Sequence, residues 1–179
     1  LTGALTAQAR ADARGAMPAD LPHRAATTLN AHMDKDKGGL AGAPKFPQPF
    51  LYQFLWQQNQ LSPEAGLDDN IITTLTRIAQ GGIYDHIGGG FARYSVDADW
   101  LVPHFEKMLY DNALLIDLFA LVWRDTRNTL LETRISETVD WLLRDMCLDN
   151  GAFAASLDAD TQGEEGKFYV WSPAEIEAV

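Results

Sequence analysis

The chain has 179 residues and is 46% hydrophobic, so it can bury a core and does not have the composition of a disordered segment. Its 14 Lys and Arg residues and 25 Asp and Glu residues give a net charge of −11, which argues against a nucleic-acid surface or a polybasic membrane anchor. The single cysteine, Cys147, excludes a disulfide framework, a CxxC redox pair and a cysteine-rich zinc site, and no apolar run reaches membrane-spanning length, so we expect a cytoplasmic protein.

Helices separated by a Gly- and Pro-rich segment are predicted for the first half of the chain. Residues 1–16 are Ala-rich and are expected to be loosely helical. The spacing of apolar residues predicts three further helices: over residues 23–33, from Phe50 onward, and from Asp69 to the stop signal at Gly81-Gly82. Ser62-Pro63 also has the pattern of a helix start.

The segments between and after these helices are of two kinds. Residues 34–49 are rich in Gly and Pro and predict an ordered loop or a linker. Residues 81–103 form the longest stretch without a helical period, and long ordered loops in compact domains tend to be functional.

In the second half, the apolar pattern predicts a well-covered helix from Pro103 to about Arg124 and another over residues 132–146. Two short strands, Phe153–Leu157 and Lys167–Trp171, are expected to flank the acidic loop DADTQGEEG as a hairpin. Ser172-Pro173-Ala174-Glu175 is a capping box that opens a last helix. Because that helix has fewer than two turns before the sequence ends, we expect the chain to be a piece of a longer protein.

These elements predict an all-α fold with a small β-hairpin, in which sequential helices pack as antiparallel hairpins. No sequence repeat of 20–50 residues is visible, which disfavours a solenoid of near-identical units.

Three segments resemble one known family. They are GGLAGAPKFPQP (38–49), GGIYDHIGGGFARYSVDADWLVPHFEKMLYDNALL (81–115) and FAASLDADTQGEEGKFYVW (153–171). Together they are similar to the family of spermatogenesis-associated protein twenty and its bacterial relatives, in which a thioredoxin-like domain precedes an α/α toroid. The resemblance implies a toroid similar to six-hairpin glycosidases and N-acylglucosamine 2-epimerases. Residues 1–179 would then be the N-terminal portion of that (α/α)6 toroid, and residues 1–20 a linker from a thioredoxin-like domain.

The strongest chemical candidate is the stretch that contains His104, Glu106, Lys107 and Asp111. If Pro103 is the first helical residue, His104 and Glu106 lie in the first helical turn, beside the long Gly-rich loop, where they could act as general base and acid. The structural alternative is that Glu106 stabilises the positive helix N-terminus and that Lys107 and Asp111 form an ordinary ion pair.

A second candidate is Tyr84-Asp85-His86 with Arg93. Asp85 could orient His86 as a tuned base, and the neighbouring glycines would let a ligand approach the backbone. The alternative is that the glycines only make a tight turn and that Arg93 pairs with Asp97 or Asp99. No phosphate-loop motif is present.

A third candidate is the acidic loop with Asp158, Asp160, Glu164 and Glu165. It starts like a calcium loop, but Tyr169 stands where the twelfth-position Glu is required. The carboxylates could instead add to a sugar site or form a solvated turn.

Three other kinds of residue complete the candidates. Tyr94 and Trp100, with Phe91 and Trp171, could stack on a sugar ring, although packing is the favoured interpretation. Lys45, between two prolines, is expected at the surface, with a site role as the alternative. Cys147 is expected to be a small buried hydrophobe.

The leading hypothesis is epimerase- or isomerase-type chemistry on a sugar. His86 and His104 would exchange a proton at a sugar carbon, with Asp85 and Glu106 orienting them. Residues expected to bind the sugar are Arg93, Tyr94, Trp100, Asp111, Asp158 and Asp160. Glycoside hydrolysis by a carboxylate pair is the related possibility.

The competing hypothesis is a non-catalytic platform that presents clients to an attached thioredoxin-like domain. Either function needs no metal or other cofactor, and neither involves nucleic acid or membrane. The two hypotheses separate on whether the imidazoles and carboxylates converge on one site.

Overall fold

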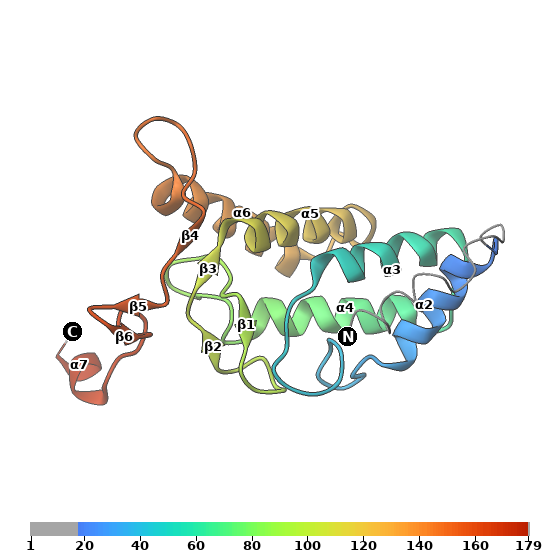
Figure 1. The fold of residues 1–179 in the computed structure, drawn as a ribbon, viewed down its shortest axis with the longest axis horizontal. Coiled ribbons are helices and arrows are strands. Elements are labelled where there is room, and N and C mark those ends of the chain that lie inside the picture. The colour runs from blue at the N-terminus through green and yellow to red at the C-terminus, as the bar shows by residue number, and fades with distance from the viewer. Residues whose placement is uncertain (1–17, 179) are drawn as a thin grey trace, which may run out of the picture.

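Antiparallel helices form one end of the molecule and short strands form the other (Figure 1). The computed structural model describes residues 18–178, so the expected helix over residues 1–16 and most of the expected linker over residues 1–20 lie outside the described part. The main helices are α2 (Leu21–Ala31), α3 (Pro49–Leu61), α4 (Leu67–Gln80), α5 (Leu109–Thr126) and α6 (Thr129–Trp141).

The core lies where α3, α4, α5 and α6 pack against one another. Each helix buries one apolar face. In α5 that face holds Leu115, Leu118, Phe119 and Val122, whereas Leu114 on its apolar arc is exposed, so the expected cover on most sides of this helix is only partly present. The fully buried apolar side chains of these helices are Tyr52, Leu55, Leu67, Ile71, Leu75, Ile78, Ala79, Leu115, Leu118, Phe119, Val122, Leu131 and Trp141. Within residues 18–178, no helix combines the length and the apolar character needed to cross a bilayer.

Three antiparallel strand pairs form the other end of the molecule. β1 (Tyr94–Ser95) pairs with β2 (Pro103–His104), and β3 (Lys107–Met108) pairs with β4 (Ser156–Leu157). β5 (Asp160–Thr161) and β6 (Glu164–Glu165) form a tight hairpin in the C-terminal segment, which projects from the helices (Figure 1).

The predicted helix start at Pro103 is wrong. Residues 103–108 are extended because β2 and β3 find strand partners far away in the sequence, and α5 begins only at Leu109. Tertiary pairing overrides the local signal of a proline followed by Glu106. His104 and Glu106 therefore do not lie in a helical turn.

The predicted hairpin is also corrected. The segments 153–157 and 167–171 do not pair with each other, because β4 pairs with β3 and the hairpin lies within the acidic loop itself. Ser62-Pro63 does not start a helix; α4 starts at Leu67, after Gly66. The capping box at Ser172 is confirmed and opens α7 (Pro173–Glu177).

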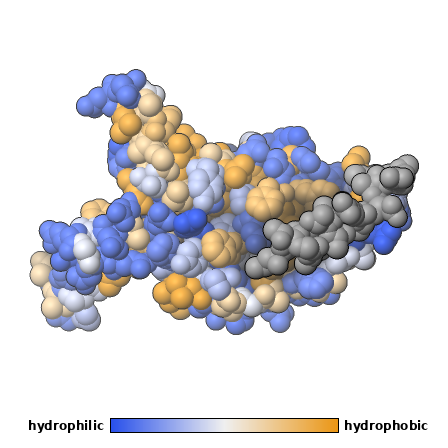
Figure 2. All heavy atoms as spheres, viewed as in Figure 1, coloured by the Kyte–Doolittle hydropathy of each residue, from blue (hydrophilic) through white to orange (hydrophobic). Residues whose placement is uncertain are grey.

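Beyond α6 the chain continues as a π-helical turn, Leu142–Met146, and an arm that leads to β4. Hydrophobic side chains gather on this projecting arm (Figure 2), and its exposed apolar residues are Leu143, Leu148 and Phe153. Cys147, expected to be buried, is exposed here.

Two loops repeat the same backbone arrangement, and we call them the Asp34 loop (residues 33–40) and the Asp85 loop (residues 84–91). Both have the sequence D-x-x-x-G-G, and in both the Asp amide donates to the carbonyl of the second of these glycines. In each, one oxygen of the aspartate accepts backbone amides two and three residues further on. The shared D-x-x-x-G-G pattern is the only trace of this repeat in the sequence, because the remaining residues of the loops differ.

Candidate functional site

The extended segment 103–108 presents two faces with different chemistry. Side chains alternate along an extended chain, so Pro103, Phe105 and Lys107 point one way and line a cavity of about 280 Å³. His104 and Glu106, between them, do not line this cavity. We call the two sides the Lys107 face and the His104 face.

On the His104 face, the imidazole is held on both sides. Its Nδ1 lies 2.7 Å from Oε1 of Glu165 in the β5–β6 hairpin, and its ring stacks on Tyr94 at 4.9 Å between centroids. A carboxylate accepts but does not donate, so Nδ1 carries the proton of this hydrogen bond. Nε2 lies 3.8 Å from Oε2 of Glu106.

Glu106 connects this histidine to Arg93. The guanidinium of Arg93 donates to Oε2 of Glu106 at 3.0 Å, and the Arg93 backbone amide donates to the Glu106 carbonyl. The expected pairing of Arg93 with Asp97 or Asp99 does not occur. Asp97 instead accepts the backbone amides of residues 99, 101 and 102, and Asp99 pairs with Lys37.

Asp111 is a carboxylic acid whose pKa is raised well above the ordinary value. Its Oδ2 is buried without a hydrogen-bond partner. Burial raises the pKa of Asp111 to about 6; Arg93 opposes this rise and the negative charge of Glu106 adds to it. The expected ion pair between Asp111 and Lys107 is absent, because Lys107 points to the other face.

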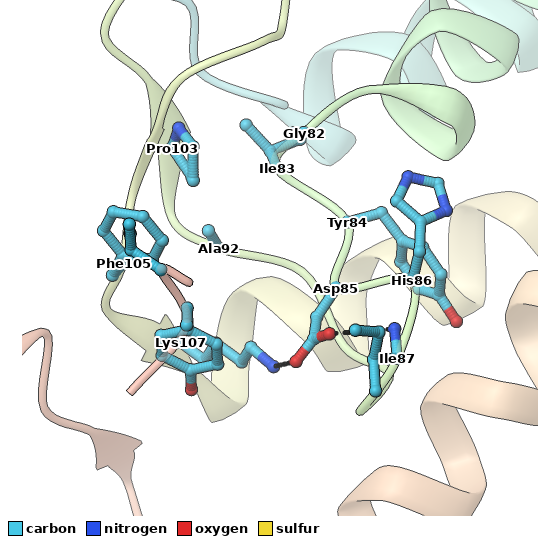
Figure 3. Close-up of a pocket in the computed structure, with 12 residues that line it drawn as sticks. Gly82, Ile83, Tyr84, Asp85, His86, Ile87, Ala92, Pro103, Phe105 and Lys107 are labelled. Atoms are coloured by element: carbon cyan, nitrogen blue, oxygen red, sulfur yellow. Dashed lines mark hydrogen bonds and ion pairs between the residues drawn. The ribbon is translucent and has the colours of Figure 1, made fainter. Parts of the chain in front are cut away.

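On the Lys107 face, the ammonium binds the Asp85 loop. Its Nζ donates to Oδ2 of Asp85 at 2.8 Å (Figure 3). It also donates to the carbonyl of Gly89 at 2.8 Å. Burial lowers the pKa of Lys107, although the Asp85 carboxylate opposes the shift. Burial works to raise the pKa of Asp85, but the amides of residues 87 and 88 together with Lys107 hold it below the ordinary value.

The expected pair of Asp85 and His86 is not formed. The carboxylate of Asp85 accepts hydrogen bonds from Lys107 and from backbone amides. Nε2 of His86 instead lies 3.0 Å from the Gly81 carbonyl, and its Nδ1 lies 3.3 Å from Arg134. In Figure 3 the His86 ring lies beside Tyr84 and away from Lys107. His86 and His104 lie in different surroundings and share none of these partners.

Three further expectations need correction or stay open. Trp100 is fully buried and its indole donates to the Lys37 carbonyl, so it is a packing residue and has no face free for a sugar. Lys45 is buried, not at the surface. Asp158 and Asp160 are exposed, and a role for them in binding stays a prediction. Within residues 18–178, no three His, Cys, Asp or Glu side chains gather in a way that could hold a metal ion.

Sequence reasoning missed two links in these sites. It named Glu165 only as part of an acidic loop, and nothing local connects that loop to His104. It treated Lys107 as a surface partner of Asp111, because a helical spacing was assumed. Alternation along residues 103–108 would have been the signal, had their extended conformation been recognised.

Comparison with known proteins gives the family and the fold. No protein-family model matches the chain. Spermatogenesis-associated protein 20 of Homo sapiens is 35% identical over 174 residues, which cover 88% of this chain and 22% of that protein. The Mus musculus protein of the same name is 34% identical over 172 residues, again with 22% of its length covered. The chain thus spans about a fifth of these relatives.

Two solved structures are similar in fold. A sugar epimerase from a ruminal bacterium has a TM-score of 0.65 at 16% identity, over 74% of this chain and 36% of that one. Cellobiose 2-epimerase from Spirochaeta thermophila has a TM-score of 0.59 at 20% identity, over 79% of this chain and 41% of that one. The helical hairpins are part of an α/α toroid, and over the region it spans the chain belongs to the family of spermatogenesis-associated protein 20.

Proposed function

We propose that this chain contributes to a carbohydrate-active toroid domain, and that the His104 face carries acid–base chemistry of the epimerase or isomerase type. The observation that carries the proposal is the contact chain from His104 through Glu106 to Arg93, with Asp111 close enough for the charges of Glu106 and Arg93 to act on its raised pKa. Two titratable groups in contrasting environments are the usual arrangement for paired base and acid roles.

His104 is the base. The Nδ1 bond to Glu165 fixes the tautomer, and stacking on Tyr94 fixes the plane of the ring, so the Nε2 lone pair has a defined direction. A proton next to a sugar carbonyl is the proton that such a base removes in an epimerisation.

Asp111 is the acid. Because its pKa is raised to about 6, a substantial fraction is protonated at slightly acidic pH and can donate to the opposite side of a reacting carbon or to an enolate oxygen. Arg93 is positioned to stabilise negative charge that develops on the substrate oxygen. In this assignment Asp111 takes the second role that the sequence suggested for His86.

An aromatic row next to His104 supports a sugar as the ligand. Phe46 stacks on Tyr94 at 4.6 Å, and Tyr94 stacks on His104, so three rings lie in succession. Phe46 is 41% exposed and offers an apolar face of the kind that packs against sugar C–H groups. The epimerase names of the two structures with a similar fold are compatible with this ligand class.

Isotope exchange tests the proposal. The native protein is incubated with a panel of aldoses and reducing disaccharides in D₂O, and deuterium at the carbon next to the carbonyl is followed by NMR. We expect incorporation that falls by about 10²- to 10⁴-fold in His104→Ala, with a large loss in Glu106→Gln. His32→Ala, which removes an exposed histidine at the end of α2, is the matched control and should leave the rate unchanged.

Two results would contradict the proposal. The first is an absence of exchange with every sugar of the panel in the native protein. The second is exchange that His104→Ala and Glu106→Gln leave as fast as His32→Ala does.

A further inference from the structure

The Lys107 amine lies in the wall of two neighbouring cavities. Lys107 and Asp85 both line the cavity of about 280 Å³ and a second one of about 450 Å³ on its other side. The Lys107 side chain is only 4% exposed to solvent. Of its three N–H donors, Asp85 and the Gly89 carbonyl account for two, so one donor direction remains without a protein acceptor.

Two aromatic rings border the amine from different elements. Nζ lies 5.2 Å from the Trp141 ring centroid and 4.9 Å from that of Tyr169, which in turn stacks on Phe105. The charged groups that also influence Lys107 are Asp145 and Arg144, and their effects on its pKa are opposite in sign. The amine is therefore in a mostly apolar site with one dedicated carboxylate.

Lys45 shows which of these features a purely structural lysine needs. Its Nζ donates to Asp34 at 3.1 Å and to the Gly38 carbonyl at 2.6 Å, and it lies 5.7 Å from the Trp100 ring centroid. These contacts match those of Lys107 with Asp85, Gly89 and Trp141, and only Tyr169 has no counterpart. Its side chain is 2% exposed, and it lines neither of the two cavities. A lysine that only stabilises a D-x-x-x-G-G loop therefore needs the contacts to the aspartate, the glycine carbonyl and the tryptophan ring. It does not need a neighbouring cavity.

We propose that Lys107 is a carbonyl-reactive amine, which forms an imine with a small aldehyde, such as an open-chain aldose, bound in the cavity lined by Phe105 and Tyr169. The proposal is independent of the acid–base chemistry on the His104 face, because it uses the opposite side of the extended segment. Burial lowers the pKa of Lys107, which increases the neutral fraction that can attack a carbonyl.

The step balances with the groups present. The ammonium gives one proton to Asp85, 2.8 Å away, and the neutral amine attacks the aldehyde carbon. A C–N bond forms as the C=O π bond breaks, the proton that the attacking nitrogen then loses moves to the oxygen, and the carbinolamine results. The hydroxyl then leaves as water with the proton that Asp85 held, and the C=N bond forms. No electron is gained or lost, and the aldehyde is the only co-reactant.

Reductive trapping tests the proposal on the native protein. The probe is glycolaldehyde with sodium cyanoborohydride at neutral pH, stopped at low conversion, followed by proteolysis and mass mapping of all five lysines. We expect the adduct on Lys107 to exceed that on Lys45 by at least about tenfold and to exceed that on exposed Lys35. The same reaction in denaturant, where all lysines are accessible, corrects for peptide detection.

Two variants separate chemistry from structure. Lys107→Arg keeps the charge and the contact to Asp85 but cannot form an imine, so the adduct at this peptide should vanish. Asp85→Asn removes the proton acceptor and also the carboxylate that opposes the lowering of the Lys107 pKa. We expect a lower Lys107 adduct with Lys45 at its native level, and such a fall would report lost proton transfer and not a smaller neutral fraction. Labelling of Lys107 that does not exceed that of Lys45 in the native protein overturns the proposal, whatever the outcome of the isotope-exchange experiment.

Discussion

The Asp34 loop and the Asp85 loop have the same backbone hydrogen bonds and each binds one lysine, but of the two only the Asp85 loop lines the cavities of about 280 and 450 Å³. Lys45 lies under Trp100, a fully buried ring whose indole closes the site by donating to the Lys37 carbonyl. Lys107 is covered by Trp141 from a helix and by Tyr169 from the C-terminal segment, and cavities remain beside them. The same loop-and-lysine motif can thus either stabilise the fold or form the wall of a candidate site, depending on which side chains cover the lysine.

Removal of the sealed lysine should have the largest effect. In Lys45→Met the Asp34 carboxylate, which is 21% exposed, and the buried Gly38 carbonyl lose a partner that is itself buried, and breaking such a pair costs about 3 kcal/mol. The free energy of unfolding from urea titration measures it. A loss of less than about 1 kcal/mol would mean that Lys45 is not a structural link.

The same change at the open loop should cost less. In Lys107→Met, water in the adjacent cavities can solvate Asp85, so we expect a loss of about 1–3 kcal/mol in the free energy of unfolding. The order of the two variants, measured under identical conditions, is the informative quantity. A larger loss in the free energy of unfolding for Lys107→Met than for Lys45→Met would contradict the distinction between a sealed Asp34 loop and an open Asp85 loop.

Two glycines test whether the tryptophans cover the loops in the same way. A Cβ at Gly39 would lie 2.7 Å from Trp100, one at Gly90 would lie 2.6 Å from Trp141, and both residues have positive φ. Alanine at either should cost about 2 kcal/mol in thermal or urea unfolding, from strain plus overlap. Gly42→Ala is the control, because Gly42 has positive φ but open space around it, and it should cost about 1 kcal/mol. Equal losses in all three variants would show that the ring contacts are unimportant.

The smallest expected effect concerns Asp111, a partly buried carboxylate that has no lysine partner, unlike Asp34 and Asp85. Its pKa of about 6 lies above the ordinary 3.8, so the folded state holds the proton more tightly than the unfolded chain and loses stability as the pH rises from about 4 to above 6. Asp111→Asn removes that charge. We expect a gain of about 1 kcal/mol at pH 8, allowing for partial exposure, and none at pH 4.

Asp34 and Asp85 should behave in the opposite sense. Burial alone would raise their pKa values, but backbone amides and the lysines hold both below 3.8. The stability that they add is present above that pH and is lost as the pH falls through their folded-state pKa values. Urea unfolding of the Asp111→Asn variant between pH 3 and pH 8 separates the two effects, and a gain at pH 4 as large as at pH 8 would refute the assignment for Asp111.

The helices were largely predictable, because apolar periodicity and stop signals are local. Gly81 ends α4 where the sequence indicated, and the capping box at Ser172 forms. The extended segment at residues 103–108 was not predictable in the same way, since its strand partners lie at residues 94–95 and 156–157. Long-range pairing leaves no local trace.

The residues of the candidate site were predictable from the sequence, but their contacts were not, because the contacts depend on long-range pairing. Residue chemistry singled out His104, Glu106, Arg93 and Asp111, and the structure places Arg93, Glu106 and His104 in contact, with Asp111 close enough to feel their charges. The pairing of Lys107 with Asp85 and that of His104 with Glu165 depend on which way an extended chain alternates and on where a distant hairpin lies. Burial of Lys45 between prolines depends on Trp100, which comes from a different loop.

The most direct test of the His104 assignment uses the small number of histidines. The chain has four, so their imidazole proton resonances can be assigned with single His→Gln variants and followed while an aldose is titrated into the native protein. The account predicts that the His104 resonance shifts saturably and that those of His23, His32 and His86 stay in place. A saturable shift of His86 with His104 unchanged, or no shift of His104 with any sugar that the protein binds, would contradict it.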